Sequence, residues 1–440
     1  MAKKNAGSTF EMDERLIREQ VEKCKPKYNI HKGDAVKWAE EYKGEKFHAL
    51  FCDPPYHLTT ITKRFGKNGS KPAKYGKDGA FQRASRGFMN QTWDGGDIAF
   101  QPETWEAFKG VMHDGAFGMA FAASRNWHRM AVAIEDAGFV IHPTMFFLWI
   151  QGQGFPKATK VRAEGFEGYK YGLQALKPAV EPIIIFQKPY NGRPIDNITE
   201  TGAGVLNIDG ARIPLEQGDE YVINEFVDGA KPWGNGAGHE YKSIKVKAPS
   251  EAVSFGNISK TPHPQPASPL GRYPANLLLD EGNAQALDRQ TGILQSGKPS
   301  GKKKAKNNIY GQYRNEDIDV TGFGDNGGAS RFFKVVNEQI DALDPFYYSA
   351  KVSPKERNAG LDKKNSHPTL KPIDLCTYLA KMLLPPVEYS PRRIFVPFAG
   401  AGSEMIGAGR AGWDEIEGVE LDTDGEYIPT ANKRLEHWLR

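Results

Sequence analysis

The short motif Asp53-Pro54-Pro55-Tyr56 follows a mostly apolar run, residues 46–52. Its two prolines fix the backbone, so the Asp53 carboxylate and the Pro54 carbonyl can form a rigid pair of hydrogen-bond acceptors. The exocyclic amino group of a nucleic-acid base is a poor nucleophile because its lone pair is delocalised into the ring. Two acceptors on its N–H bonds favour the pyramidal geometry in which the lone pair can attack, most effectively in a dry, pre-arranged site. Tyr56 would offer a ring on which the base can stack, so we predict that these four residues are catalytic.

A second motif, residues 398–403, reads Phe-Ala-Gly-Ala-Gly-Ser and lies between an expected strand and an expected helix. Glycines let a ligand approach the backbone, and a helix N-terminus presents unpaired N–H groups. Glu420 follows Gly400 by twenty positions, at the end of the next expected strand. An acid in this place can accept hydrogen bonds from the ribose hydroxyls of an adenosine-containing cofactor. The spacing alone leaves both NAD and S-adenosylmethionine open.

The elements that must position these motifs alternate between strands and helices. Apolar runs predict strands, and helical spacing of apolar residues predicts helices. The expected strands cover residues 46–52, 117–122, 139–150, 183–186, 393–396 and 416–421, and the expected helices cover 124–138, 372–384, 403–411 and 425–439. Such alternation favours a mostly parallel α/β sheet. Residues 191–330 are rich in Gly, Pro, Asn and Ser and lack long helical periodicity, which predicts an irregular inserted domain.

The order of the motifs resembles the β class of the DNA amino-methyltransferases. Asp-Pro-Pro-Tyr at 53–56 comes first, a long variable region follows, and His-Pro-Thr-Leu-Lys-Pro at 367–372 precedes the glycine loop. The resemblance implies an α/β, Rossmann-like S-adenosylmethionine-dependent methyltransferase fold with a largely irregular inserted target recognition domain. The resemblance covers residues 28–440 and leaves only a charged leader (1–27) outside. The domains within it are a catalytic half (28–190), the target recognition domain (191–330) and a cofactor-binding half (331–440).

The same resemblance assigns roles to individual residues. It implies S-adenosyl-L-methionine as cofactor and double-stranded DNA as partner, with Asp53, Pro54 and Tyr56 holding the target amino group. The implied cofactor-binding residues are Asp34, Thr369, Lys371, Phe398, Gly400, Gly402, Ser403 and Glu420. For Asp34 a helix N-cap is an alternative, and for Lys371 a solvated helix start. The family usually has Asp-Pro-Phe before the glycine loop, whereas this chain has Val396 in place of the acid, so we expect altered cofactor contacts there.

A basic segment, residues 57–90, begins directly after the catalytic motif. Its only acid is Asp78, which leaves a net charge of +7 within a chain whose net charge is +4. The basic residues are Lys63, Arg64, Lys67, Lys71, Lys74, Lys77, Arg83 and Arg86. A base inside a duplex must be flipped out to reach a catalytic pocket, and these residues would neutralise the nearby phosphates. A solvated loop is the alternative. A second group of lysines, at 298, 302–304 and 306, would contact phosphate or serve solubility.

Three functions compete. Asp53 at the head of the motif favours adenine N6 as the methylated atom, since family members acting on cytosine N4 more often carry Ser there. A nicotinamide oxidoreductase would explain Gly400 and Glu420 but not the catalytic motif, and a non-catalytic DNA-binding relative would explain the basic segment alone.

Composition sets outer limits on these functions. The chain has 440 residues, of which 39% are apolar and 25% are charged, with 47 Gly and 29 Pro. These values exclude a collagen-like or wholly disordered chain. Three cysteines without a Cys-x-x-Cys spacing indicate neither a disulfide framework nor a zinc site, so we predict no metal and a reducing compartment. The polar N-terminus and the lack of a membrane-length apolar run predict a cytoplasmic protein, either a monomer or a homodimer.

Overall fold

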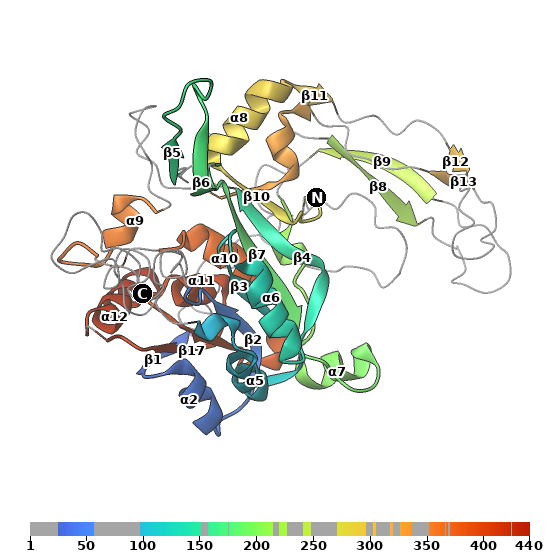
Figure 1. Ribbon diagram of the computed structural model, residues 1–440. Helices are drawn as coiled ribbons and strands as arrows, with labels where there is room; N and C mark the ends of the chain where they lie inside the picture. The colour runs from blue at the N-terminus through green and yellow to red at the C-terminus, as the bar shows by residue number, and fades with distance from the viewer. Residues whose placement is uncertain are drawn as a thin grey trace, which may run out of the picture. The chain divides into compact units, whose positions relative to one another are not determined.

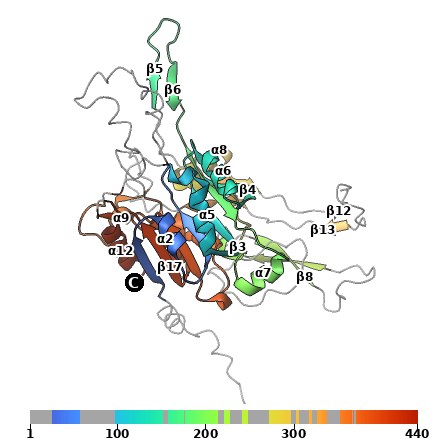
Figure 2. The same ribbon diagram turned by 60° about the horizontal axis from the view of Figure 1, so that its bottom comes forward.

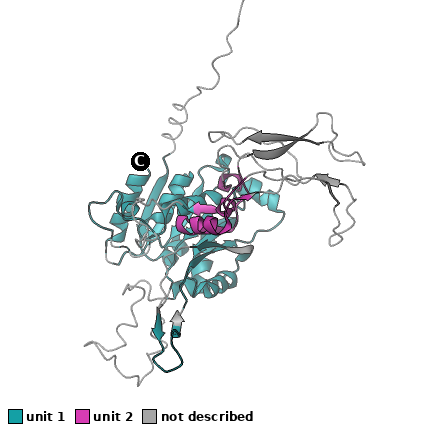
Figure 3. Cartoon of the chain, turned by 90° about the horizontal axis from the view of Figure 1, so that it is seen from above, with its two compact units in different colours: residues 1–207, 336–440 teal, residues 208–335 magenta. Residues whose placement is uncertain are grey.

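The computed structural model divides the chain into two compact units, residues 1–207 with 336–440 and residues 208–335 (Figure 3). It describes residues 25–56, 97–150, 157–174, 176–213, 220–226, 241–247, 271–295, 302–304, 317–319, 326–336, 352–365, 367, 370–423 and 425–440. Each unit is a structural body of its own, and the predicted catalytic and cofactor motifs all belong to the first.

A twisted sheet forms the centre of the first unit (Figure 1). The strands that this unit contributes to the sheet follow the spatial order β1–β17–β16–β2–β3–β7–β4. Their bounds are β1 (Lys27–Lys32), β2 (Phe47–Cys52), β3 (Met112–Phe121), β4 (Val140–Ile150), β7 (Val180–Gln187), β16 (Arg393–Pro397) and β17 (Glu415–Glu420). Neighbouring strands are parallel from β1 to β3, whereas β7 is antiparallel to both β3 and β4.

Four consecutive strands of this sheet bring the predicted motifs to one edge. Strands β1, β17, β16 and β2 are parallel neighbours, so their carboxyl ends meet at the same edge. Asp34 follows β1, Glu420 ends β17, Phe398 follows β16 and Asp53 follows β2. Ligands of open α/β sheets bind outside the carboxyl ends of the strands, so a ligand site is expected at this edge.

Helices cover both faces of the sheet (Figures 1 and 2). On one face α2 packs on α5 and α5 on α6, and on the other α10 packs on α11 and α11 on α12. The helices of this unit are α2 (Ala35–Glu41), α5 (Pro102–Val111), α6 (Trp127–Asp136), α7 (Pro194–Thr201), α9 (Pro354–Asn358), α10 (Ile373–Met382), α11 (Ser403–Ala411) and α12 (Tyr427–Trp438). The short 3-10 helices are η3 (Ile98–Phe100) and η6 (Val387–Tyr389).

The core between the sheet and α2, α5 and α6 is aromatic. Trp105 and Phe108 of α5 are fully buried, and Phe108 packs edge-on against Phe395 of β16 at a ring distance of 5.6 Å. Burying an aromatic side chain contributes roughly 1.5–3 kcal/mol. Trp149 is also fully buried, and the partly buried Trp127 packs against the core.

The structure confirms the predicted α/β, Rossmann-like fold, and all of the expected strands and helices occur near their expected bounds. The inserted unit begins at 208 rather than 191, because α7 belongs to the first unit. Asn197 of α7 donates a hydrogen bond to the Asp114 carbonyl (3.0 Å), and Tyr389 donates one to the Thr199 carbonyl (3.0 Å).

The described residues of the second unit include a helix that the sequence did not predict. This 11-residue helix, α8 (Glu281–Thr291), is capped by Asp280, whose side chain accepts a hydrogen bond from the Asn283 N–H (2.6 Å). Only Ala284 of this helix is buried, so the apolar periodicity that would have predicted it is missing. The other elements of the unit are η4 (Asp209–Ala211), β8 (Glu220–Phe226), β9 (Tyr241–Lys247), β10 (Leu277–Asp280), β11 (Leu294–Gln295), β12 (Lys302–Lys304), β13 (Asp317–Asp319), β14 (Asn326–Gly327), η5 (Ala329–Phe332) and β15 (Lys334–Val336), which ends at the boundary.

An antiparallel hairpin of β5 (Lys157–Lys160) and β6 (Lys170–Gln174) connects β4 to β7. Among the helices of the described ranges, none has the length and apolar character needed to cross a bilayer.

Candidate active site

Asp53 lies at the centre of the site, directly after β2. Its Oδ2 atom is contacted by the Nζ atom of Lys371, whose side chain is 3% exposed. The same Nζ lies 4.0 Å from Glu181 Oε2, at the start of β7, and 4.7 Å from the centre of the Phe121 ring. The other carboxylate oxygen, Asp53 Oδ1, is buried and accepts no hydrogen bond from any described residue. A buried acceptor without a donor is costly, so this oxygen is suited to receive an N–H group from a ligand.

Tyr56 is fixed beside this carboxylate from two directions. Asn126 donates a hydrogen bond to the Tyr56 carbonyl (2.9 Å), and Lys371 Nζ lies 5.2 Å from the centre of the Tyr56 ring. The hydroxyl is buried close to the Asp53 carboxylate, without the geometry of a full hydrogen bond to any described residue. Burial, and next the negative charge of Asp53, raise the pKa of Tyr56 well above its usual value. Tyr56 is therefore a neutral ring adjacent to the free oxygen of Asp53.

The glycine loop between β16 and α11 is strained. Phe398 has a φ of 60°, which non-glycine residues rarely adopt, and Gly400 and Gly402 have φ values of 51° and 79°. A Cβ atom at Gly400 would lie only 2.9 Å from His367 Nε2. The loop thus needs glycine at 400 for both conformation and space, and strain of this kind gathers at ligand sites.

Glu420 connects the loop to the end of β17. Its Oε2 accepts a hydrogen bond from the Gly400 N–H (2.8 Å), and its Oε1 accepts one from the Asp422 N–H (3.1 Å). Burial raises the pKa of Glu420, and the backbone N–H groups oppose that rise. A carboxylate oxygen can accept two hydrogen bonds, so each oxygen retains one acceptor position. The carboxylate is both anchored and able to hold a pair of hydroxyl groups.

Arg434 of α12 stabilises the glycine loop through hydrogen bonds, a contact that the sequence did not predict. It is fully buried, and its Nη1 donates hydrogen bonds to the Ala401 carbonyl and to Ser403 Oγ (3.3 Å). Ser403 is thereby engaged within the protein through its hydroxyl. An arginine on a C-terminal helix gives no sequence signal that distinguishes it from a surface charge.

Two more buried titratable groups adjoin the site. Burial lowers the pKa of His367 to about 4, so its imidazole is neutral beside Gly400 near pH 7. Glu404 is the second residue of α11, and burial, followed by the negative charge of Asp53, raises its pKa to about 7. Perturbed groups of this kind are typical of functional sites.

The structure places the predicted cofactor-binding residues in different surroundings. Gly400, Gly402 and Glu420 meet at the carboxyl edge, whereas Asp34 caps α2 by accepting hydrogen bonds from the Val36 and Lys37 N–H groups (2.9 and 3.1 Å). Its Oδ1 accepts both, and a contact to a cofactor remains a prediction. Lys371 lies on Asp53 rather than in a solvated helix start. Val396, which stands where the family has an acid, is buried in the core.

Several predicted residues lie outside the described part of the chain. These are Thr369, the eight basic residues Lys63, Arg64, Lys67, Lys71, Lys74, Lys77, Arg83 and Arg86, and the lysines at 298 and 306. The remaining lysines of the second group form β12, and the backbone register places Lys302 opposite Asp319 and Lys304 opposite Asp317.

No family model and no curated protein matches the sequence. Similar solved structures are DNA methyltransferases. The M1.HpyAVI–SAM complex is 13% identical, covers 92% of this chain and 99% of its own, and has a TM-score of 0.35. The cytosine-N4-specific PvuII DNA methyltransferase is 11% identical, covers 93% and 87%, and has a TM-score of 0.42. A DNA modification methylase assigned in Thermus thermophilus is 13% identical, covers 93% and 94%, and has a TM-score of 0.36.

Proposed function

We propose that this protein transfers a methyl group from S-adenosylmethionine to the N6 amino group of adenine in double-stranded DNA. One observation carries the proposal. Asp53 has one buried carboxylate oxygen held by Lys371 and a second, Oδ1, that accepts no hydrogen bond from the described residues. An amino group of a base is the N–H donor that this oxygen and the adjoining Tyr56 ring fit.

The chain's own residues would activate that amino group. Asp53 Oδ1 accepts one N–H and the Pro54 carbonyl accepts the other, which draws the nitrogen toward a pyramidal geometry and directs its lone pair out of the base plane. Lys371 keeps the carboxylate from rotating, because it contacts Oδ2 and is itself enclosed by Phe121 and Tyr56. Acceptors fixed before the substrate arrives need no reorganisation during the reaction, and removing one hydrogen-bonding group of this type typically costs about 10²–10³ in rate.

The residues present fit the proposed cofactor. The two oxygens of Glu420 each retain an acceptor position for a ribose hydroxyl, and the glycine loop lies directly beside this carboxylate, because the Gly400 N–H donates to Glu420 Oε2. When bound, S-adenosylmethionine supplies an electrophilic methyl group on a sulfonium. The adjacency of β16 and β2 in the sheet puts the glycine loop next to Asp53, so one edge serves both ligands.

Cytosine N4 is the alternative target. The exocyclic amino groups of adenine and cytosine present the same pair of N–H donors, so Asp53 fits both, and adenine is preferred on the resemblance of the motif alone. Nucleoside analysis after methylation separates the two, because it yields either N6-methyladenine or N4-methylcytosine. A protein that binds DNA without transferring methyl groups would be a non-catalytic relative.

The decisive experiment is transfer of a labelled methyl group from S-adenosylmethionine to unmethylated duplex DNA of diverse sequence. We expect incorporation that depends on Asp53. No incorporation into any duplex, with the protein folded and the cofactor bound, would overturn the proposal. The basic segment 57–90 is proposed to contact phosphates beside the flipped base. Reversing its charges should therefore flatten the salt dependence of DNA binding.

A further inference from the structure

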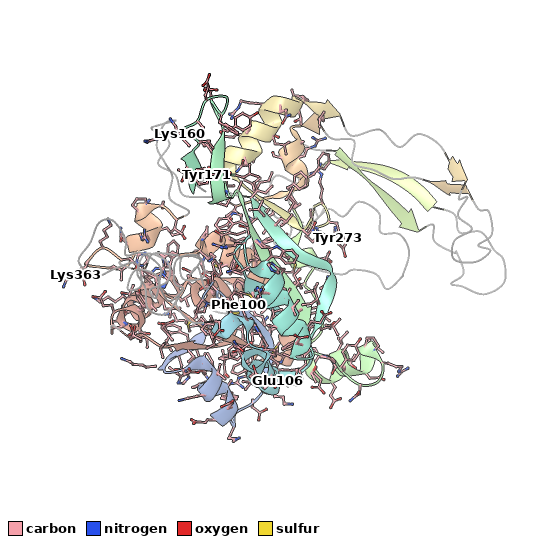
Figure 4. The ribbon with its side chains drawn as sticks, in the orientation of Figure 1. Phe100, Glu106, Lys160, Tyr171, Tyr273 and Lys363 are labelled. Atoms are coloured by element: carbon pink, nitrogen blue, oxygen red, sulfur yellow. The ribbon has the colours of Figure 1, made fainter. Side chains whose placement is uncertain are left out.

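The β5–β6 hairpin has an unusual surface for a connection between two sheet strands. We call residues 157–174 the hairpin arm. Phe166, Tyr169 and Tyr171 are 49%, 65% and 55% exposed, and Figure 4 labels Tyr171 and Lys160 on the two strands. A two-stranded hairpin that buries little surface is marginally stable in water. Neither the core nor the catalytic site described above requires these exposed aromatic side chains.

The charges of the hairpin arm are arranged unfavourably for an isolated hairpin. The antiparallel register places Lys160 directly opposite Lys170, and like charges in this position destabilise a strand pair. Neither lysine, nor Arg162, has an ion-pair partner among the described residues. The two acids, Glu164 and Glu167, lie in the turn rather than beside the lysines. An anion bound between the lysines would remove the repulsion.

Tyr169 and Tyr171 lie on the opposite face of the hairpin from Lys160 and Lys170. Successive residues of a strand point to alternate faces, so Tyr169 and Tyr171 share one face while Lys170 points to the other. The Val161 N–H donates a hydrogen bond to the Tyr169 carbonyl (3.2 Å), which extends the pairing to Tyr169. The rings of Phe166 and Tyr169 pack edge-on at 5.9 Å. The hairpin arm therefore presents one basic and one aromatic face.

The hairpin arm leaves the sheet at the same edge as the candidate active site. Strand β3 is parallel to β2, and both β3 and β4 are antiparallel to β7. Strand β4 therefore ends, and β7 begins, at the edge where Asp53 follows β2. The connection between Ile150 and Val180 must depart from this edge (Figure 2). A DNA duplex that presents a base to Asp53 would therefore carry its phosphates close to Lys160 and Lys170.

We propose that the hairpin arm is a DNA-binding element. Lys160 and Lys170 contact phosphates of the duplex next to the target base, and Tyr169 and Tyr171 pack against the exposed groove surface. A two-stranded β-ribbon has dimensions that the major groove admits. This inference rests on the proposed function, because it takes double-stranded DNA as the ligand, and it adds a contact surface separate from segment 57–90 and from the second unit.

The charge test uses the double variant Lys160→Gln/Lys170→Gln in the full chain. Binding to a duplex of about 40 base pairs and mixed sequence is measured between about 50 and 200 mM salt, the range over which phosphate contacts weaken strongly. Loss of two phosphate contacts should reduce the slope of log K against log salt by about 1.8, raise the KM for DNA and leave kcat unchanged. The matched control is Lys43→Gln/Lys46→Gln, two exposed lysines at the amino end of β2, which should keep the wild-type slope.

The aromatic test uses Tyr169→Ser/Tyr171→Ser. Since no charge is removed, this variant should raise the KM for DNA while retaining the wild-type salt slope. A wild-type slope in the lysine variant, or a wild-type KM in the tyrosine variant, overturns the assignment of that face. If the wild-type protein neither binds duplex nor transfers methyl groups, the proposed function fails. If it methylates DNA while the lysine and tyrosine variants match it, only the hairpin arm proposal fails.

Discussion

The Nζ atom of Lys371 contacts the carboxylate of Asp53, although the two residues are 318 positions apart in the chain. The family resemblance assigns Lys371 to the binding of the cofactor. In the structure its ammonium group instead lies between Asp53, Glu181 and two aromatic rings. A positive charge in this position fixes one oxygen of the Asp53 carboxylate, so under the proposed function Lys371 is a positioning residue for Asp53.

Replacing Lys371 with methionine separates these two roles. The variant leaves Asp53 in a buried site without its cation, and breaking a buried pair in this way costs about 3–5 kcal/mol of folding free energy. We expect kcat for methyl transfer to fall at least about tenfold while the Kd for S-adenosylmethionine, measured by calorimetry, stays near the wild-type value. If the Kd for S-adenosylmethionine rose by the same factor as kcat fell, Lys371 would be a cofactor-binding residue and not a positioning residue for Asp53.

The double variant Asp53→Asn/Lys371→Met is the control for folding. It removes both charges of the pair, so the free energy of unfolding should recover toward the wild-type value, because no uncompensated charge stays buried. Methyl transfer should remain lost. Recovery of activity together with stability would show that the pair serves folding alone.

Asp53→Asn tests the catalytic acceptor itself. The amide keeps the size of the side chain but replaces one acceptor oxygen with a donor, which opposes an incoming N–H. We expect kcat to fall by about 10²–10³ with cofactor affinity nearly intact, as measured by single-turnover methyl transfer and calorimetry. A loss of cofactor affinity together with an unchanged rate at saturating cofactor would show that Asp53 does not act on the base.

Glu420→Gln should have the converse effect. Glutamine keeps an acceptor oxygen for one of the two backbone N–H groups and puts an N–H donor where the other oxygen stood. This removes an acceptor for the ribose, so the Kd for S-adenosylmethionine should rise at least about tenfold, or about 1.4 kcal/mol. DNA affinity should not change. The matched control is Glu417→Gln on the same strand, which removes a carboxylate bonded to Asn29 (3.0 Å). Equal losses of cofactor affinity in both variants would contradict a specific role for Glu420.

Local sequence signals predicted most of the first unit. Helix α11 begins at Ser403 and ends at Ala411 as expected, and the strand–glycine–helix–strand order fixed the positions of Gly400 and Glu420. Because parallel strands place their carboxyl ends together, the meeting of Asp53 with the glycine loop was also foreseeable. Predicting which strands are neighbours still required the resemblance to a known family.

The contacts that complete the site could not be predicted in this way. Arg434 supports Ala401 and Ser403 from a helix whose other charged residues face solvent, and Lys371 resembles the ordinary start of a helix. Their roles depend on packing between elements distant in sequence, which leaves no periodic signal. The hairpin arm was missed for a different reason, since its strands, Lys-Ala-Thr-Lys and Lys-Tyr-Gly-Leu-Gln, are short and contain no run of apolar residues.

The final prediction concerns acid stability and the amino end of the sheet, opposite the active site. His48 is buried in β2, its Nδ1 accepts a hydrogen bond from the Arg393 N–H (3.1 Å), and its ring lies 4.8 Å from that of His113. Burial, and next the charge of His113, lower the pKa of His48 from 6.5 to about 4. Between these values the unfolded chain binds the proton and the folded chain does not, so the free energy of unfolding falls as the pH falls.

The contribution of His48 is complete above about pH 6.5 and is lost progressively down to about pH 4, amounting to at most about 3 kcal/mol. His48→Gln keeps an acceptor for Arg393 but cannot titrate, so its stability should depend less on pH across this window. Urea denaturation at several pH values from about 7.5 down to about 4 measures the slope, and His128→Gln on the exposed side of α6 is the control. Identical pH slopes for wild type and His48→Gln would show that this histidine is protonated in the folded protein.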